Sequence, residues 1–375
     1  MNTGHMNSPA HAHPRVIFGA GMLRRLGEVV VDEGGTRVLL VTDPGIVAAG
    51  HADHGAERLR EAGVEVTVFD GTRENPTTEH VAAGVQIARD LGIDCIVGLG
   101  GGSAMDCAKG VNFLLTNGGR MQDYWGVGKA ARPMLPLIAV PTTAGTGSEA
   151  QSFALITDPA THQKMACGDK KALPRAAILD PDLIRTVPRA VAAATGIDAV
   201  AHSIETAGTT KRTDASRALS RKAWGLIEPS FEMAFRDPDD AAAREAMLLG
   251  AHHAGAAIEM SMLGAAHACA NPLTARYGIV HGVAVGLLLP QVIRFNAASG
   301  ENPYADLDCD AESLARRVEA MLAAATLPTR LSQLGVEADA LMALSETAAE
   351  QWTAQFNPRP IGPAEALTIY RTAFV

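Results

Sequence analysis

Short apolar runs alternate with alanine-rich segments over the first half of the chain, and few folds accommodate this alternation. The runs at 16–18, 38–41, 64–69, 95–99 and 137–140 have the length and the aliphatic composition of buried strands. Segments between them, such as 55–63 and 78–91, are predicted to be helices. A strand–helix–strand succession predicts a largely parallel sheet, which binds ligands at the carboxyl ends of its strands.

The pattern changes near Thr186. Three further strands or hairpins are predicted at 153–158, 164–167 and 176–179. Prolines at 181 and 188 then interrupt the chain, and amphipathic, alanine-rich spacing dominates beyond them, for example at 239–260, 310–325 and 363–373. We therefore predict a flexible leader at 1–14, an α/β domain at 15–186 and an all-helical domain at 187–375.

Charge and composition exclude several classes of protein. The 375 residues carry 32 Lys and Arg against 41 Asp and Glu, a net charge of −9 that disfavours binding to nucleic acid or anionic membranes. No apolar run reaches the roughly 18 residues of a membrane span, and no secretory signal pattern is present at the amino end. Because the five cysteines form no C-x-x-C pair, we predict unpaired thiols and a cytoplasmic enzyme.

Four side chains in the second half have the chemistry of a divalent-metal site. Asp198 and His202 are four residues apart and would share one face of a helix, while His267 and His281 lie further along in alanine-rich sequence. One carboxylate and three imidazoles suit Fe²⁺ or Zn²⁺, whereas Ca²⁺ prefers oxygen ligands alone. On spacing alone, core or capping histidines remain the alternative.

A glycine-rich turn in the first half has the features of a phosphate site. Gly100, Gly101, Gly102 and Ser103 follow a predicted strand and open a predicted helix, where backbone N–H groups can approach a pyrophosphate. Ser103 takes the place of the third glycine of a full dinucleotide motif, so a plain strand-to-helix turn remains the alternative. Asp43, after the second strand, would accept hydrogen bonds from ribose hydroxyls and repel a 2′-phosphate, which favours NAD over NADP.

Several sequence blocks together resemble the iron-containing (group III) alcohol dehydrogenase family. They are the Asp198, His202, His267 and His281 pattern, the segments 98–106 and 141–149, and Asn357-Pro358-Arg359-Pro360. The blocks follow the order of that family and extend from about Val16 to near the end of the chain. The resemblance implies a Rossmann-like α/β domain that binds NAD, followed by an all-α domain that binds the metal and substrate, as in the dehydroquinate synthase-like fold.

The resemblance also implies roles for individual residues. The implied metal ligands are Asp198, His202, His267 and His281. The implied cofactor contacts are Asp43, Gly100, Gly101, Gly102, Ser103, Asp106, Thr142, Thr143, Thr146, Ser148 and Lys164. For Asp106, a carboxylate that merely stabilises the first turn of a helix is the alternative, and for Lys164 it is a solvated surface lysine.

The implied activity is NAD(H)-dependent hydride transfer between nicotinamide and a small aldehyde or primary alcohol, whose oxygen the metal polarises. His267 and His281 would then serve catalysis through the ion. Many family members carry a histidine four residues after the third ligand, but Asn271 stands there and cannot titrate near neutral pH, so a proton relay at this position is lost.

Arg276 lies between the third and fourth ligands, where an apolar side chain would be more usual. We predict that Arg276 receives an anionic tail on the substrate, such as a phosphonate, sulfonate or carboxylate, and a surface salt bridge is the alternative. Candidate substrates are phosphonoacetaldehyde, sulfoacetaldehyde and lactaldehyde. Two other functions remain open: a lyase of the dehydroquinate synthase type, which also uses NAD and a metal, and a non-catalytic assembly protein. A homodimer is predicted.

Overall fold

A six-stranded parallel sheet forms the centre of the amino-terminal part of the computed structural model, which describes residues 13–161 and 163–375. The strands pair in the order β1-β9-β6-β4-β2-β3, and every neighbouring pair is parallel. Their bounds are β1 (Arg15–Phe18), β2 (Arg37–Val41), β3 (Glu65–Phe69), β4 (Cys95–Gly100), β6 (Leu137–Pro141) and β9 (Ala176–Leu179).

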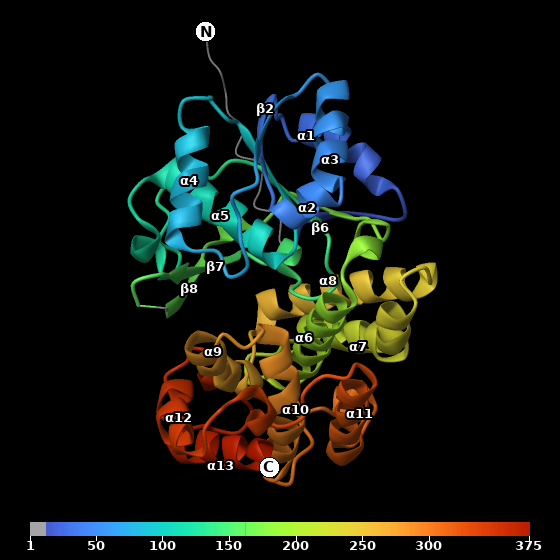
Figure 1. Cartoon of the computed structure of the whole chain (residues 1–375), viewed down its shortest axis with the longest axis vertical. Coiled ribbons are helices and arrows are strands. Elements are labelled where there is room, and N and C mark those ends of the chain that lie inside the picture. The colour runs from blue at the N-terminus through green and yellow to red at the C-terminus, as the bar shows by residue number, and fades with distance from the viewer. Residues whose placement is uncertain (1–12, 162) are drawn as a thin grey trace.

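Helices cover both faces of this sheet because its central strands are apolar on both sides (Figure 1). On one face, α1 (Leu26–Asp32) and α3 (His51–Glu61) contribute Leu26, Val29 and Leu59 to a buried cluster. On the other face, α4 (Thr78–Ala88) and α5 (Gly102–Asn117) pack against the sheet through a second buried cluster. A small sheet of β5 (Gly126–Val127), β8 (Gln163–Gly168) and β7 (Phe153–Asp158) adjoins α5.

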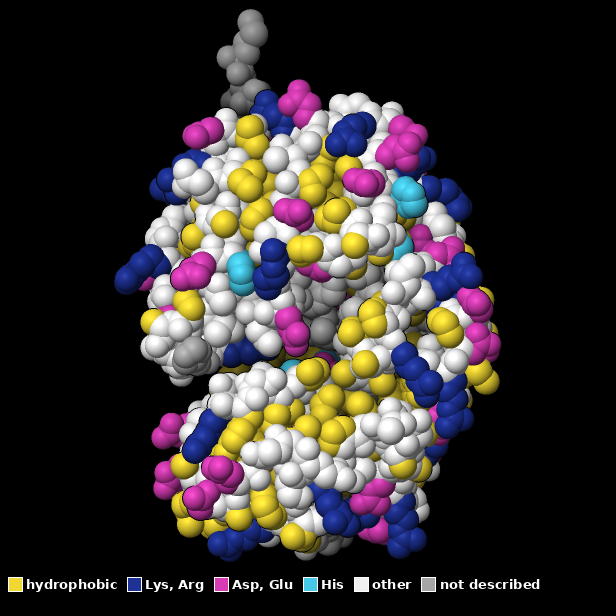
Figure 2. Space-filling model, viewed as in Figure 1, with side chains coloured by type: hydrophobic (Ala, Val, Ile, Leu, Met, Phe, Trp, Pro, Cys, Tyr) yellow, Lys and Arg dark blue, Asp and Glu magenta, His cyan; other side chains and the backbone are white. Residues whose placement is uncertain are grey.

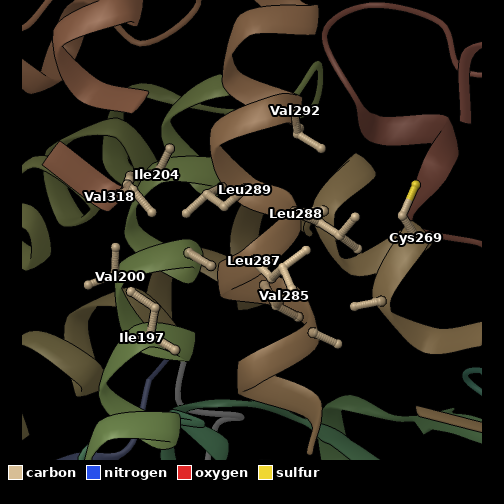
Figure 3. Packing of buried hydrophobic residues seen from close by; sticks show 14 of the residues in the cluster. Ile197, Val200, Ile204, Cys269, Val285, Leu287, Leu288, Leu289, Val292 and Val318 are labelled. Carbon is tan, nitrogen blue, oxygen red and sulfur yellow. The ribbon is translucent and has the colours of Figure 1, made fainter. Parts of the chain in front are cut away.

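The remaining part of the chain is helical (Figure 1). Its helices are α6 (Arg189–Gly208), α7 (Asp214–Arg236), α8 (Ala241–Ser261), α9 (Ala265–Tyr277), α10 (His281–Ala297), α11 (Ala311–Ala324), α12 (Leu341–Ala349) and α13 (Pro363–Phe374). One large apolar cluster joins them. Figure 3 shows Ile197, Val200 and Ile204, spaced at three and four residues along α6, among the buried side chains that α6 and α10 contribute to this cluster.

Helix α8 connects the two parts of the molecule. Gly255 of α8 approaches the backbone of Gly147 so closely that a Cβ on Gly255 would lie 2.4 Å from the Gly147 carbonyl oxygen. Nearby, the buried Glu259 accepts hydrogen bonds from the backbone N–H and the hydroxyl of Ser152 at 2.9 and 2.8 Å. These contacts fix the helical part against the loop that follows β6.

The predicted fold class is confirmed: a parallel α/β sheet is followed by a part whose described secondary structure is helical. The last strand ends at Leu179 and α6 begins at Arg189, and the exact division at residue 186 stays a prediction. Residues 1–12 of the predicted leader lie outside the described residues. No helix within residues 13–161 and 163–375 is long and apolar enough to cross a bilayer.

Boundaries differ from the prediction where the apolar pattern is weak. The helix predicted at 55–63 begins earlier, at His51, and the helix predicted at 78–91 ends at Ala88. The short helix α2 (Pro44–Ala48) was not predicted, because five residues are too few to show a helical period. Its start is set by Asp43, whose carboxylate accepts hydrogen bonds from the N–H groups of Gly45 and Ile46 at 2.9 and 3.1 Å.

Candidate metal and cofactor site

Four candidate metal ligands converge where α6, α9 and α10 meet. Single ligand atoms of Asp198, His267 and His281 all lie within 4.8 Å of one another. The Asp198 Oδ1 atom is 3.5 Å from His267 Nε2 and 3.6 Å from His202 Nε2. The His202 ring stacks on the His267 ring with centroids 4.9 Å apart. The structure therefore brings together all four side chains that the sequence singled out.

Three buried polar atoms of this cluster lack a hydrogen-bond partner among the described residues. Asp198 Oδ1, His267 Nε2 and His281 Nδ1 are buried and form no hydrogen bond with any described residue. Buried polar atoms without a partner are costly, so a cluster of them indicates a bound group. Oxygen and imidazole nitrogen donors fit Fe²⁺ or Zn²⁺, and the donor set therefore suits the predicted ion.

The imidazoles of His202 and His267 are oriented toward Asp198 by hydrogen bonds at Nδ1, the ring nitrogen on the opposite side from Nε2. His202 Nδ1 lies 3.2 Å from the carbonyl oxygen of Gly145, and His267 Nδ1 lies 2.5 Å from Glu205 Oε2. If each Nδ1 donates its proton to the neighbouring oxygen, each Nε2 keeps a free lone pair toward Asp198. Both rings then have the tautomer that a metal ligand requires.

The electrostatics of the cluster favour a cation. Burial acts to raise the pKa of Asp198, but the facing histidines outweigh it and hold this pKa below its ordinary value. Burial acts to lower the pKa of His267, yet Glu205 and Asp198 raise it to about 9. Burial lowers the pKa of His281 to about 3. Two carboxylates thus supply the negative charge that a buried dication needs.

The glycine-rich turn lies at the carboxyl edge of the sheet, as predicted. Strand β4 ends at Gly100, whose φ of 154° lies in the region that favours glycine, and α5 begins at Gly102. The Thr142 N–H donates to the Gly100 carbonyl at 3.0 Å, and a Cβ on Gly101 would lie 3.5 Å from the Thr143 side chain. The Oγ1 atoms of both threonines are buried without a hydrogen-bond partner among the described residues.

Three further predicted cofactor residues, Thr146, Ser148 and Asp106, lie around this turn. Thr146 packs against Gly102, where an added Cβ would come within 2.7 Å of it. Ser148 donates to Asp106 at 2.7 Å and accepts from the buried Lys109 ammonium at 2.7 Å. Asp106 and Ser148 therefore belong to a buried network that holds the loop after β6 onto α5.

A cavity of about 650 Å³ opens between the small sheet and the helical part. We call it the cleft pocket; its lining includes Trp125, Phe153, Lys164, Asn271, Arg276 and Trp352. In Figure 2 the surface is hollowed between the upper and lower parts, with histidine and acidic side chains visible at the base of the hollow. None of the four candidate ligands lines the cleft pocket, but two of its lining residues relate it to the metal cluster. Asn271 lies one helical turn after His267 on α9, and Lys164 acts on the pKa of His281.

Three predicted residues line the cleft pocket. Lys164 is half-buried, donates to Asn75 Oδ1 at 3.1 Å and has its pKa lowered by burial, so it is not a solvated surface lysine. Asn271 donates to Gln351 Oε1 at 3.0 Å. Arg276 is exposed, with its guanidinium 5.6 Å from the centre of the Tyr277 ring. Among the described residues Arg276 has no carboxylate partner, so the predicted alternative of a salt bridge is not found there.

Sequence reasoning missed two buried residues of this region. Glu205 lies seven residues after Asp198 and three after His202, so helical spacing could have placed it beside them. Lys109 donates hydrogen bonds to the Ser148 and Phe153 carbonyl oxygens at 2.7 and 2.8 Å. The one local signal is the three-residue spacing from Asp106, whose carboxylate lies 3.7 Å from the Lys109 ammonium; the two carbonyl partners are about 40 residues away in the sequence.

Comparisons with known proteins agree with this geometry. The model of the family described as iron-containing alcohol dehydrogenase matches residues 13–181, and its C-terminal counterpart matches residues 192–374. Alcohol dehydrogenase 4 of Schizosaccharomyces pombe is 35% identical over 95% of this chain and 87% of its own length. The NAD-dependent methanol dehydrogenase of Bacillus methanolicus is 32% identical over 92% of this chain and 94% of its own length.

Solved structures resemble the whole chain as well. A 1,3-propanediol oxidoreductase is 34% identical with a TM-score of 0.91, covering 96% of this chain and 98% of its own. A sulfoacetaldehyde reductase from Bifidobacterium kashiwanohense, solved in complex with NAD⁺, is 27% identical with a TM-score of 0.86, covering 96% of each chain. These matches favour neither the lyase nor the non-catalytic assembly protein. The chain belongs to the iron-containing alcohol dehydrogenase family, as the sequence predicted.

Proposed function

We propose that this NAD-dependent alcohol dehydrogenase interconverts a small aldehyde and its primary alcohol at a dication held by Asp198, His202, His267 and His281. The observation that carries the proposal is the pair of buried, unpartnered atoms Asp198 Oδ1 and His267 Nε2, 3.5 Å apart. Fe²⁺ and Zn²⁺ both accept these donors. When bound, the ion acts as a Lewis acid on the substrate oxygen, and the nicotinamide donates or accepts the hydride.

The proposed NAD site is the edge of the sheet around the glycine-rich turn. The first turn of α5 offers N–H groups and the positive end of its dipole to the pyrophosphate. The unpartnered hydroxyls of Thr142 and Thr143 support a polar ligand beside it. Asp43 would accept hydrogen bonds from ribose hydroxyls, since its Oδ1 already caps α2 while Oδ2 faces the Gly100 region. Asp106, Thr146 and Ser148 would hold the surrounding loop.

Lys164 and Asn271 have the next roles in the proposed reaction. Lys164 reaches into the cleft pocket from β8 and is close enough to the metal cluster to act on the pKa of His281. Asn271 is held by Gln351 and cannot exchange a proton near neutral pH, so it orients groups in the pocket by hydrogen bonding. The proton that accompanies hydride transfer therefore enters or leaves at another position.

We further propose that the natural substrate is a short aldehyde with an anionic tail. Arg276 and Lys164 both line the cleft pocket, and Glu350 is the one acidic residue among its described lining residues. A guanidinium binds a sulfonate, phosphonate or carboxylate through paired hydrogen bonds. The solved relative named sulfoacetaldehyde reductase acts, by its name, on an aldehyde of this class.

A homodimer in the cytoplasm completes the proposal. Strand β1 forms one edge of the large sheet, and its Val16 and Phe18 side chains are exposed. An exposed apolar edge strand favours association with a second copy. The five unpaired cysteines accord with a reducing compartment. Light scattering coupled to size-exclusion chromatography measures the assembly directly, and a monomeric mass would contradict the dimer.

The function is tested with protein reconstituted with Fe²⁺ under anaerobic conditions or with Zn²⁺. NADH consumption is followed with aldehydes of two to four carbons, each in a neutral and an anionic version. We expect metal-dependent activity, lost in Asp198→Ala, and a higher kcat/KM for the anionic versions. Equal or lower kcat/KM for the anionic versions would contradict the substrate class, and NADH consumption without metal would contradict the proposed site.

A further inference from the structure

Helix α9, which carries His267, begins after Gly264, a residue with no side chain that could cap the helix. Its N-cap is Gly264, and the first two N–H groups are bonded instead by acceptors far away in the sequence. Ala265 N–H donates to Asn357 Oδ1 at 3.1 Å, and Ala266 N–H donates to Glu205 Oε1 at 2.7 Å. A Cβ on Gly264 would lie 2.9 and 3.1 Å from these same two oxygens. Glycine therefore makes room for both acceptors.

The Glu205 carboxylate holds both the helix and the imidazole. Its Oε1 binds the backbone of Ala266, while its Oε2 lies 2.5 Å from Nδ1 of the next residue, His267. Because one buried carboxylate binds both the Ala266 N–H and the His267 ring, the imidazole has little freedom about its side-chain torsions. The ring is thereby turned so that Nε2 faces Asp198 at 3.5 Å.

Asn357 connects this end of α9 to α10, the helix that begins with His281. The Asn357 Nδ2 atom donates to Asn296 Oδ1 at 2.7 Å, and Asn296 lies in the last turn of α10. Asn296 Nδ2 in turn donates to the hydroxyl of Tyr304 at 2.8 Å. Asn357, Asn296 and Tyr304 are all buried, so water does not compete for these hydrogen bonds.

The same three helices also pack through apolar side chains, as Figure 3 shows for Ile197, Leu288 and Cys269. Apolar contact is not directional, so it fixes how far apart the helices lie but not how an imidazole is turned. The hydrogen bonds through Glu205 and Asn357 supply direction. They reach α6, α9 and α10, which together carry all four proposed ligands.

We propose that Glu205 and Asn357 are positioning residues that set the affinity for the catalytic metal by presenting His267 to it. We call the pair the α9 clamp. The inference rests on the proposed ligand set. Neither residue is a ligand: each acts through His267 and the start of α9. Carboxylates that hold a ligating histidine typically contribute about 10- to 100-fold to metal affinity.

Glu205→Gln tests the clamp with little change in shape. Glutamine has a single acceptor oxygen, so it can serve the Ala266 N–H or the His267 Nδ1–H but not both. We expect the Kd for Zn²⁺, measured by chelator competition, to rise about 10- to 100-fold. The visible absorption of the Co²⁺-substituted protein should change as well, because this spectrum reports ligand geometry.

Glu149→Gln is the matched control, since Glu149 is also a buried carboxylate facing an imidazole, with Oε1 3.2 Å from His252 Nδ1. His252 is not among the proposed ligands, so this variant should keep the wild-type Kd and Co²⁺ spectrum. Asn357→Ala removes the other half of the clamp and should weaken Zn²⁺ binding at least threefold; it also tests the proposal if Glu205→Gln does not fold. Wild-type Kd and spectrum in the folded clamp variants would overturn the proposal.

Asp198→Ala separates failure of the clamp from failure of the ligand set. If this variant binds Zn²⁺ as tightly as wild type, the ligand set is wrong. If Asp198→Ala loses the metal while Glu205→Gln and Asn357→Ala keep it with altered thermal stability alone, the ligand set stands and the clamp is only structural.

Discussion

Arg276 is the residue on which the proposed substrate class most depends. Its guanidinium lies on the wall of the cleft pocket and stacks over Tyr277. We expect Arg276→Ala to raise KM for an anionic aldehyde about five- to tenfold, which is about 1 kcal/mol, because the side chain is exposed and solvent weakens the ion pair. The kcat should change little, since the contact is made equally in the ground state and the transition state.

The neutral aldehyde of the same length is the control for Arg276→Ala, and its KM should stay within about twofold of wild type. Arg276→Lys keeps the charge but loses the paired hydrogen bonds, so an intermediate KM is expected. An equal rise in KM for neutral and anionic aldehydes would mean that Arg276 only shapes the pocket.

Asp43 allows a second prediction at this scale, because its carboxylate has two separable roles. One is to cap α2 through Oδ1, and the other is the proposed repulsion of a 2′-phosphate. Asn caps helices as well as Asp does, so Asp43→Asn should preserve stability while removing the charge. We expect KM for NADPH to fall about tenfold relative to KM for NADH, and KM for NADH itself to rise because an amide nitrogen cannot accept from ribose hydroxyls. An unchanged ratio of the two KM values would contradict the role of Asp43 in cofactor choice.

Individual site residues could be predicted where spacing or a motif exposed them. Asp198 and His202 follow from a four-residue interval on one helix, and the glycine-rich turn follows from its place after a strand. Glu205 shares the helical spacing but was overlooked. Asn357 lay in a block that the sequence singled out, yet its contact with Ala265 spans 92 residues and could not be inferred from local pattern.

Helix α8 carries a histidine that should make the protein sensitive to acid. Burial, with smaller effects from His252 and Lys222, lowers the pKa of His253 to about 4. Between pH 6.5 and 4 the unfolded chain binds a proton that the folded chain does not. The free energy of unfolding is therefore expected to fall as the pH drops through this range, by less than about 1.4 kcal/mol per unit because the side chain is only partly buried.

His253→Gln isolates this contribution. Between pH 7 and pH 5 the variant should lose about 1 kcal/mol less stability than wild type, measured by urea unfolding of the metal-free proteins. Equal losses in the two proteins would show that other groups account for the acid sensitivity.

Helices and strands with a long, clear apolar pattern could be predicted, and elements too short to show such a pattern could not. The central strands at 95–99 and 137–140 are buried on both faces, so their sequences are continuously apolar. The two-residue strand β5 and the short helix α2 carry too few residues for any period. The cleft pocket draws its lining from β8, α9 and the segment around Trp352, whose meeting depends on tertiary packing.

One of the contacts that hold the two parts of the molecule together joins two glycines. A Cβ on Gly255 would lie 2.4 Å from the Gly147 carbonyl oxygen, and a backbone atom cannot move aside cheaply. We expect Gly255→Ala to lower the free energy of unfolding by about 2 to 3 kcal/mol, measured with urea. The loss should occur although alanine is the better helix former.

Gly225→Ala is the matched control for Gly255→Ala. Gly225 lies inside α7, and nothing stands within 4 Å of an added Cβ there. This variant should gain about 0.5 to 1 kcal/mol from helix propensity alone. Stabilisation by both substitutions would mean that α8 can shift away from the loop after β6 without cost.

Trp352 stacks on Phe153 in the lining of the cleft pocket, with ring centroids 5.5 Å apart and planes inclined by 24°. Trp125 lines the same pocket, and the chain has three tryptophans in all. Two of its three indoles thus line the pocket proposed for the substrate. We expect the intrinsic tryptophan fluorescence of the protein to decrease when NADH binds. Cofactor binding can therefore be followed in real time without an attached dye.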